Sequence, residues 1–471
     1  MTDSSSLGGL GLEKWITLVV ASVATAILLL DVTIVYVALP SVRADLGATF
    51  DEAQWVIDAY TVVMAATLLA CGSLADRIGR RRVFSAGLIV FTVCSAIAGA
   101  AGNALVLDIA RGFQGLGAAA MYAASLALLA NEFQGKQRGL AFGVWGAVTG
   151  AALAVGPLVG GLVIDGLSWR WIFLVNVPIG VLTLAGTLLF VRESREPKSS
   201  RFDLAGTVLF AASAFLLVLG LIRGNEDGWG SPLILGTFLV SALLAAAFIR
   251  VELKSADPML PLRFFKSKPF TGTAIVSLAQ SIAIYPLLLF LAIYLQEGLG
   301  FGPTEAGLRL LPMTLSIFLV APFAGRLTSR VTIRLPLASG LALLAVSLMP
   351  IYGIDADDAW TRLLPGIIVG GISIGLISPS LAAAMVSVLP VEKSGLASGI
   401  NNSGRQLGIA IGIAGLGAIF DHQVNSGASV LAGIASGLNA VILVAASTAA
   451  LAAIVCWPLL GRQKSSENVE L

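Results

Sequence analysis

The sequence predicts an all-α integral membrane protein. Of its 471 residues, 57% are hydrophobic and only 12% are charged, which leaves too little polar surface to cover a soluble globule of this size. The apolar residues form continuous runs of about 20 residues or more, the length that a helix needs to cross a bilayer core of about 30 Å. Backbone groups in lipid must be hydrogen-bonded within the chain, and continuous runs exclude the short alternating strands of a barrel.

Fourteen such runs occur, and we expect a membrane-spanning helix in each. The first run is too long for the apolar part of a signal peptide and contains Asp31, so we expect it to remain as the first helix. The runs lie at residues 15–40, 53–75, 83–101, 104–130, 139–165, 171–191, 204–222, 231–249, 270–296, 304–325, 335–353, 361–389, 395–420 and 433–460.

The short connection between the second and third runs sets the expected orientation. It reads Gly72-Ser73-Leu74-Ala75-Asp76-Arg77-Ile78-Gly79-Arg80-Arg81-Arg82. Basic connections stay in the cytoplasm because cationic flanks resist translocation and anionic lipids of the inner leaflet attract them. With the amino terminus inside, most of the 29 Lys and Arg residues are cytoplasmic, and both termini are expected there. The exceptions are Arg43, Arg170, Arg223, Arg309 and Arg362 outside, and Arg111 and Arg405 within helices.

Two short motifs recur at similar spacings of 256 and 253 residues. Gly139-Leu140-Ala141-Phe142-Gly143 recurs as Gly395-Leu396-Ala397-Ser398-Gly399, and Gly72-x-Leu-x-x-Arg77 recurs as Gly325-x-Leu-x-x-Arg330. Two matches at the cytoplasmic ends of helices indicate parallel repeats of six spans. Because this spacing exceeds the length of a six-span unit, we expect two inserted helices between the repeats. The predicted division is an amino-terminal bundle at 1–200, an inserted pair at 201–255 and a carboxy-terminal bundle at 256–471. The pair is expected outside the two-bundle core, against lipid or between the bundles.

The sequence resembles the major facilitator superfamily. The motifs that carry the resemblance are the 72–82 loop, Leu30-Asp31-Val32-Thr33-Ile34-Val35-Tyr36-Val37-Ala38-Leu39-Pro40, Arg111-Gly112-Phe113-Gln114-Gly115 and Gly156-Pro157-Leu158-Val159-Gly160-Gly161. The order of six, two and six spans is similar to the fourteen-span drug:proton antiporters of the EmrB/QacA type, over essentially the whole chain. That family usually has Asn where this chain has Tyr36, which changes the outer part of the expected pocket.

Charged residues at membrane depth are costly and are functional candidates by default. At 1.5 Å per residue, Asp31, Asp58 and Arg111 lie within about 5 Å of one another in depth, so they can share one layer of an outward-opening cavity. We expect Asp31 to be the principal proton-binding carboxylate and Asp58 the second. Alternatives are a structural bond from Asp31 to the backbone or Tyr36, and a headgroup position for Asp58. The resemblance ties Arg111 to proton transfer, and a structural salt bridge is the other interpretation.

Two motifs are candidates for conformational gating. Gly156 and Pro157 with Gly160 and Gly161 predict a bent helix in tight contact with its neighbours, a pattern that the family associates with antiporters. In the basic loop, Asp76 is expected to cap or salt-bridge a helix end and hold the inner side closed. The other gating candidates of this loop are Gly72, Arg77, Gly79 and Arg80. The alternatives are ordinary glycine packing for the first motif and the positive-inside rule for the arginines.

A polar segment in the thirteenth run predicts the substrate cavity. Asn401, Asn402, Arg405 and Gln406 occupy one and a half turns near mid-membrane, where such a turn must face protein or water. A buried structural network is the alternative. Weaker candidates for the cavity lining are Gln114, Tyr122, Gln280 and Tyr285, and Tyr36 is expected to add an aromatic wall and a hydroxyl to the outer part of the pocket.

These observations predict a secondary transporter and no enzyme. The chain lacks a Gly-x-x-x-x-Gly-Lys-Ser/Thr phosphate loop, so the expected energy source is an ion gradient, and no cofactor, metal or nucleic acid is expected. The resemblance implies a monomeric proton-coupled exporter of lipophilic small molecules, including cations, in a bacterial plasma membrane. Expected partners are substrate, protons and lipids. Alternatives are an exporter of a lipid or dedicated metabolite, a proton-coupled uptake symporter and a non-transporting sensor or scaffold.

Overall fold

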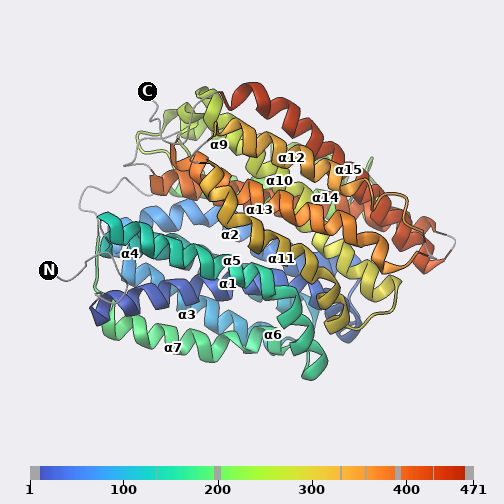
Figure 1. Cartoon of the computed structure of the whole chain (residues 1–471), viewed down its shortest axis with the longest axis horizontal. Coiled ribbons are helices and arrows are strands. Elements are labelled where there is room, and N and C mark those ends of the chain that lie inside the picture. The colour runs from blue at the N-terminus through green and yellow to red at the C-terminus, as the bar shows by residue number, and fades with distance from the viewer. Residues whose placement is uncertain are drawn as a thin grey trace.

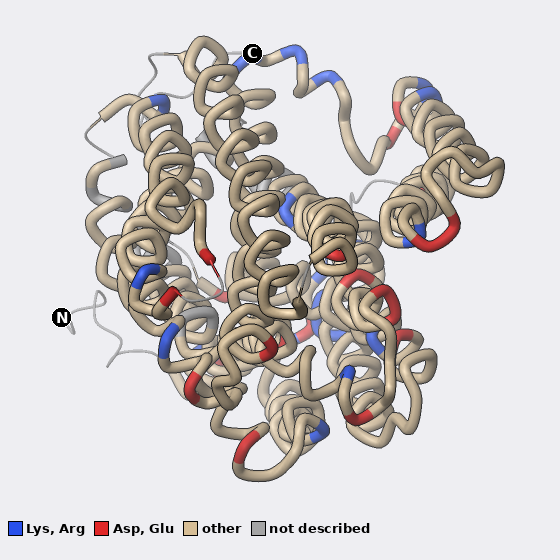
Figure 2. Tube along the Cα trace, turned by 90° about the vertical axis from the view of Figure 1, so that its right-hand side faces the viewer, with Lys and Arg blue, Asp and Glu red and all other residues tan. Residues whose placement is uncertain are grey.

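A computed structural model describes residues 11–133, 135–195, 203–328, 331–355, 358–387, 394–427 and 429–461, and its elements there are helices (Figure 1). Charged residues are sparse along the chain (Figure 2). The α-helices are α1 (Leu12–Leu46), α2 (Phe50–Ile78), α3 (Arg80–Gly99), α4 (Ala104–Glu132), α5 (Gly135–Gly166), α6 (Trp171–Leu174), α7 (Asn176–Phe190), α8 (Leu204–Asp227), α9 (Pro232–Lys254), α10 (Lys268–Ile293), α11 (Pro303–Thr328), α12 (Arg334–Leu348), α13 (Leu364–Ser387), α14 (Ser394–Ser426) and α15 (Val430–Leu459). Shorter helices are the 3₁₀ turns η2 (Leu262–Lys266) and η4 (Trp360–Leu363) and the π-turn η3 (Tyr294–Gly298).

Each of the fourteen predicted runs overlaps a helix. Twelve helical segments of the described chain are long and apolar enough to cross a membrane, and α5, which bends by 46°, makes a thirteenth if it is one span. The apolar helix α12 has only 15 residues. The all-helical membrane fold is therefore confirmed, whereas the count of fourteen spans stays a prediction. Of the predicted repeat and linker, Arg330 and residues 196–202 lie outside the described residues.

The long helices form two groups that lie side by side (Figure 1). Helices α1–α7 pack mainly on one another, and so do α10–α15. The groups meet along two seams, one between α5 and α11 and the other between α2 and α14. The start of α1 and the end of α15, the helices nearest the termini, lie at the same end of the molecule (Figure 1). This arrangement places one group on each side of a central interface.

The inserted helices differ in how they are held. Helix α8 packs against both α2 and α14, so it lies over the seam between the two groups. Helix α9 packs on α8, where the Ser213 and Ser241 hydroxyls each donate to the other's backbone carbonyl at 3.0 and 2.8 Å. The α8 seam contact is a small apolar cluster with six fully buried members. They are Val62, Ala214, Val218, Ile222, Ala410 and Ala414.

Glycines of α5 allow the close helix contacts that the sequence predicts. A Cβ at Gly156 would lie 1.9 Å from the Thr33 hydroxyl oxygen of α1, and one at Gly161 would lie 2.5 Å from the Pro303 carbonyl oxygen of α11. The α11 glycine Gly307 meets the carbonyl of Pro157 in the same way, again at 2.5 Å. The two groups therefore touch backbone to backbone at this seam.

We expect Gly307→Leu to separate α11 from α5. Its side chain would overlap the Pro157 backbone, and overpacking of this kind costs about 1–3 kcal/mol. Thermal unfolding of the purified protein in detergent measures the effect. Gly236→Leu on α9 is the matched control, because nothing lies within 4 Å of a Cβ there. Equal unfolding temperatures for the two variants would contradict the tight seam.

Candidate functional site

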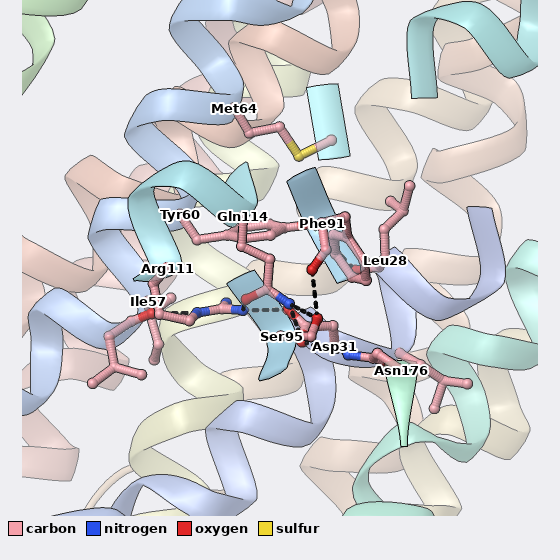
Figure 3. Close-up of polar contacts among 12 residues, drawn as sticks. Leu28, Asp31, Ile57, Tyr60, Met64, Phe91, Ser95, Arg111, Gln114 and Asn176 are labelled. Carbon is pink, nitrogen blue, oxygen red and sulfur yellow. Dashed lines mark hydrogen bonds and ion pairs between the residues drawn. The ribbon is translucent and has the colours of Figure 1, made fainter. Parts of the chain in front are cut away.

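A buried ion pair joins α1 to α4. The Arg111 guanidinium donates to the Asp31 carboxylate, and both residues are almost completely enclosed (Figure 3). The same guanidinium donates through Nη1 to the Gln114 amide oxygen at 2.8 Å and through Nε to the Val56 carbonyl oxygen of α2 at 2.8 Å. The sequence prediction that Asp31 and Arg111 share one layer thus corresponds to direct contact between them.

Three neutral side chains complete what we call the Asp31 cluster. Gln114 donates to Asp31 at 3.2 Å and to the Ser95 hydroxyl of α3 at 2.8 Å, and Asn176 of α7 donates to Asp31 at 3.3 Å (Figure 3). The cluster, formed by Asp31, Ser95, Arg111, Gln114 and Asn176, therefore draws on four helices of the amino-terminal group. Asp31 has the partners that a buried carboxylate needs.

Aromatic rings close the cluster off. The Arg111 guanidinium lies 4.3 Å from the centroid of the Tyr60 ring and 5.5 Å from that of Phe173. All five cluster side chains are buried, so in this conformation they do not face the outward-opening cavity that the sequence analysis expects. Gln114, expected among the cavity residues, lies in this cluster instead.

Asp58 of α2 is buried without a hydrogen-bond partner. Its side chain is fully enclosed, and neither carboxylate oxygen has a donor within hydrogen-bonding distance. The side chain therefore lies inside the protein, and its depth relative to the headgroups stays a prediction. A buried carboxylate without a donor is costly when charged, which distinguishes Asp58 from the fully bonded Asp31.

A second polar group lies where the two groups of helices meet. The Tyr122 hydroxyl of α4 makes hydrogen-bonding contact with Asn402 and Arg405 of α14, and Arg405 makes the same contact with Tyr285 of α10. Tyr36 of α1 lies within electrostatic reach of Arg405 and Tyr285, and its own hydroxyl has no hydrogen-bond partner. We call these five residues the tyrosine–arginine cluster. It brings together residues that the sequence analysis proposes for substrate binding.

The remaining predicted cavity residues lie nearby but make separate contacts. The Gln406 amide contacts the Met64 sulfur of α2 at 2.9 Å, which places it across the α2–α14 seam. The side-chain oxygen of Asn401 is buried without a partner. Gln280 donates to the Ser378 hydroxyl at 3.1 Å within the carboxy-terminal group.

The basic loop is held within the amino-terminal group. Asp76 forms an ion pair with Arg80 at 2.8 Å, and Gly79 between them has a φ of +123° that L side chains rarely adopt. Beyond the end of α7, the Glu193 carboxylate accepts hydrogen bonds from the Arg81 and Arg82 backbone amides in the first turn of α3. The predicted salt bridge of Asp76 is present, and its partner lies on the next helix of the same group. Arg77 is exposed, and Gly72 packs against Ala123.

Several polar contacts between the two groups have no counterpart in the sequence analysis. At the end opposite the termini, Arg43 of α1 pairs with Glu297 of η3 at 3.1 Å. There too, the Gln54 amide donates to the Ile413 carbonyl oxygen at 3.2 Å. Two further bonds join the Gln296 amide to the Val37 carbonyl at 2.9 Å and the Thr304 backbone amide to Asp165 at 2.8 Å. These bonds join the two groups of helices at the end opposite the termini.

The comparisons with known proteins agree with this architecture. The family model of the Major Facilitator Superfamily matches residues 21–413 and 270–470. The chain belongs to this superfamily. Among solved structures, a POT family transporter in complex with 5-aminolevulinic acid superposes with a TM-score of 0.70 at 15% identity, covering 98% of both chains. A bacterial homolog of the human lysosomal transporter Spinster, inward-facing and unoccupied, gives 0.67 at 16% identity over 96% of this chain and 98% of that one. At these identities the likeness shows the fold alone.

Curated superfamily members are similar along most of their length. The puromycin resistance protein pur8 of Streptomyces alboniger is 35% identical, over 97% of this chain and 93% of its own. The tetracenomycin C resistance and export protein of Streptomyces glaucescens is 34% identical over 90% and 78%. The multidrug resistance protein Stp of Mycobacterium tuberculosis (strain CDC 1551 / Oshkosh) is 35% identical over 86% and 75%. The match thus extends through both groups of helices.

We expect Arg111→Gln to destabilise the protein by about 3–5 kcal/mol, because it leaves the buried Asp31 carboxylate without its cation. Thermal unfolding in detergent measures this loss. The double variant Asp31→Asn with Arg111→Gln should recover part of it. Asp58→Asn is the control, since it removes a buried carboxylate that has no partner to lose. An equal loss in Asp58→Asn and Arg111→Gln would contradict the special role of the pair.

Proposed function

We propose that this superfamily member is a proton-coupled exporter of lipophilic small molecules, of the fourteen-span drug:proton antiporter type. The resistance and export functions named for the similar proteins support export. The observation that carries proton coupling is the presence of two carboxyl groups, Asp31 and Asp58, buried within membrane-spanning helices. Carboxyl groups at such depth are rare outside ion and substrate pathways.

The proposed coupling acts through helices that the two polar clusters share. Helix α1 carries Asp31 and Tyr36, and helix α4 carries Arg111 and Tyr122. The eleven residues from Arg111 to Tyr122 are about three helical turns, so both side chains lie on the same face of α4. Protonation of Asp31 would neutralise its attraction to Arg111, and the resulting shift of α1 and α4 would move the tyrosines directly. Each ligand then changes the conformational equilibrium by its differential affinity for the two states.

In this proposal the two bundles, 1–200 and 256–471, rock about the tyrosine–arginine cluster while the pair at 201–255 stays at one seam. The basic loops place both termini in the cytoplasm of a bacterial cell. The described conformation, with polar bonds at the opposite end, then corresponds to closure on the outer side. Export would use protons and substrate, with the chain acting as a monomer in its lipid surroundings.

Transport by purified protein in liposomes tests the proposal. With an acidic lumen and the cytoplasmic surface facing outward, the wild type should accumulate lipophilic probes in a gradient-dependent manner. Asp31→Asn and Asp58→Asn should lose this accumulation, since neither can release a proton from the substituted group. Glu226→Gln is the control, because that carboxylate is exposed and lies outside both clusters. Gradient-driven transport that persists in both Asn variants would exclude these carboxyl groups as proton carriers.

A second experiment tests closure of the outer end. Arg43→Gln removes an exposed inter-bundle ion pair of about 0.2–1 kcal/mol, so outer opening should increase up to about fivefold. The rate at which an impermeant maleimide labels Tyr36→Cys from outside reports that opening. Arg223→Gln is the matched control, because Arg223 pairs with Asp227 within α8 and does not join the bundles. Equal labelling rates in the two backgrounds would contradict the assignment of Arg43 and Glu297 to the outer closure.

A further inference from the structure

The tyrosine–arginine cluster contains a cation without a counter-ion. No carboxylate of the described residues lies within ion-pair distance of Arg405, and its Nε atom is buried without a hydrogen-bond partner. The other intramembrane arginine, Arg111, has Asp31 as its direct partner. Burying a guanidinium without an anion is costly. The uncompensated charge of Arg405 therefore suggests that this residue has a function.

The surroundings of Arg405 are hydrogen-bond donors and aromatic rings. Tyr122 and Tyr285 contact it, Asn402 contacts Tyr122, and each of these side chains carries a donor group. The Tyr36 hydroxyl, also nearby, is buried and has no partner of its own. Arg405 as a whole residue is half-buried, its Nε atom is enclosed, and Tyr36 and Tyr122 are buried. Hydroxyl and amide groups thus surround one positive charge that has no carboxylate partner among the described residues.

The carboxylates that led us to expect cationic substrates are not available here. Asp31 is occupied by Arg111, Gln114 and Asn176 in a closed cluster. Asp58 lies near Tyr36, but it is fully enclosed and forms no ion pair with Arg405. A lipophilic cation placed among the tyrosines would therefore meet the charge of Arg405 before that of either carboxylate.

We propose that the tyrosine–arginine cluster binds lipophilic organic anions and carbonyl-rich aromatic molecules, whose acceptor oxygens engage Arg405 and the tyrosine hydroxyls. A planar guanidinium matches carboxylate and enolate oxygens in a bidentate manner. The tyrosine rings supply faces for an aromatic body. Because Tyr36 and Tyr122 belong to one group of helices and Tyr285 and Arg405 to the other, such a ligand bridges the two. This inference rests on the proposed export function and narrows its substrate class.

Equilibrium binding in detergent tests the charge preference without a proton gradient. The probes are 1-pyrenecarboxylate and 1-pyrenemethylammonium, which share an aromatic body and carry opposite charges. Their fluorescence is titrated against purified full-length protein, with protein-free micelles as the background. We expect the wild type to bind the carboxylate more tightly than the ammonium probe. Removal of a charge-assisted contact in Arg405→Gln should weaken carboxylate binding about 10- to 100-fold and leave ammonium binding unchanged or stronger.

Further variants separate a binding role from a structural one. Arg405→Lys keeps the positive charge and should retain part of the carboxylate affinity that Arg405→Gln loses. Tyr285→Phe removes one hydroxyl and should weaken the carboxylate by a smaller factor. Retained helical circular dichroism in each variant shows that it is folded. Tighter ammonium binding by the wild type, the absence of specific carboxylate binding, or unchanged carboxylate affinity in Arg405→Gln would each overturn the proposal.

The outcomes for binding and for export are distinguishable. Arg405-dependent carboxylate binding without gradient-driven transport in liposomes would retain the inference and reject proton-coupled export. Gradient-driven transport of lipophilic cations that is insensitive to Arg405→Gln would retain proton-coupled export and reject the inference that Arg405 binds anions.

Discussion

The ion pair between Asp31 and Arg111 is the contact around which the amino-terminal group is built. It has almost no exposure to solvent, so each charge depends on the other and on the neutral donors beside it. Those donors come from α4 and α7, the Ser95 hydroxyl of α3 accepts from one of them, Gln114, and the Val56 carbonyl adds α2. One electrostatic requirement therefore fixes the mutual positions of five helices in a fold that otherwise depends on apolar packing.

The same helices extend from this pair to the interface with the other group. Helices α1 and α4 are continuous over 35 and 29 residues, so in the proposed mechanism a change near Asp31 would be transmitted along them to Tyr36 and Tyr122. The seams allow such movement because small residues bring the backbones into contact without interlocking long side chains. In the proposed mechanism, polar bonds between the two groups of helices determine which end of the molecule is closed. The proton site and the substrate site are separate in this scheme, and helix rigidity links them.

Much of the architecture follows from the sequence because the bilayer imposes simple rules. Length and hydropathy identify the helices, and the cost of burying charge identifies Asp31, Asp58 and Arg111 as special. Depth along a helix does not fix its rotation, so the sequence does not reveal that Gln114 turns toward Asp31. Asn176 is a missed residue with a readable signal, an amide within an otherwise apolar span. The sequence carries no signal for the pairing of Arg43 with Glu297, because 254 residues separate them. The missing counter-ion of Arg405 likewise depends on tertiary structure alone.

The position of the inserted hairpin makes the two sides of the molecule unequal. Helix α8 lies over the α2–α14 seam and is tied to α14 by the Asn225 amide, which donates to the Ala418 carbonyl at 2.6 Å. On the other seam, Leu162 of α5 and Leu315 of α11 are each 55% exposed and face the surroundings directly. A molecule dissolved in the hydrocarbon thus meets the hairpin over the α2–α14 seam, whereas at the α5–α11 seam it meets the helices of the two groups themselves. The hairpin therefore determines which of the two seams is covered and which presents its own helices to the lipid.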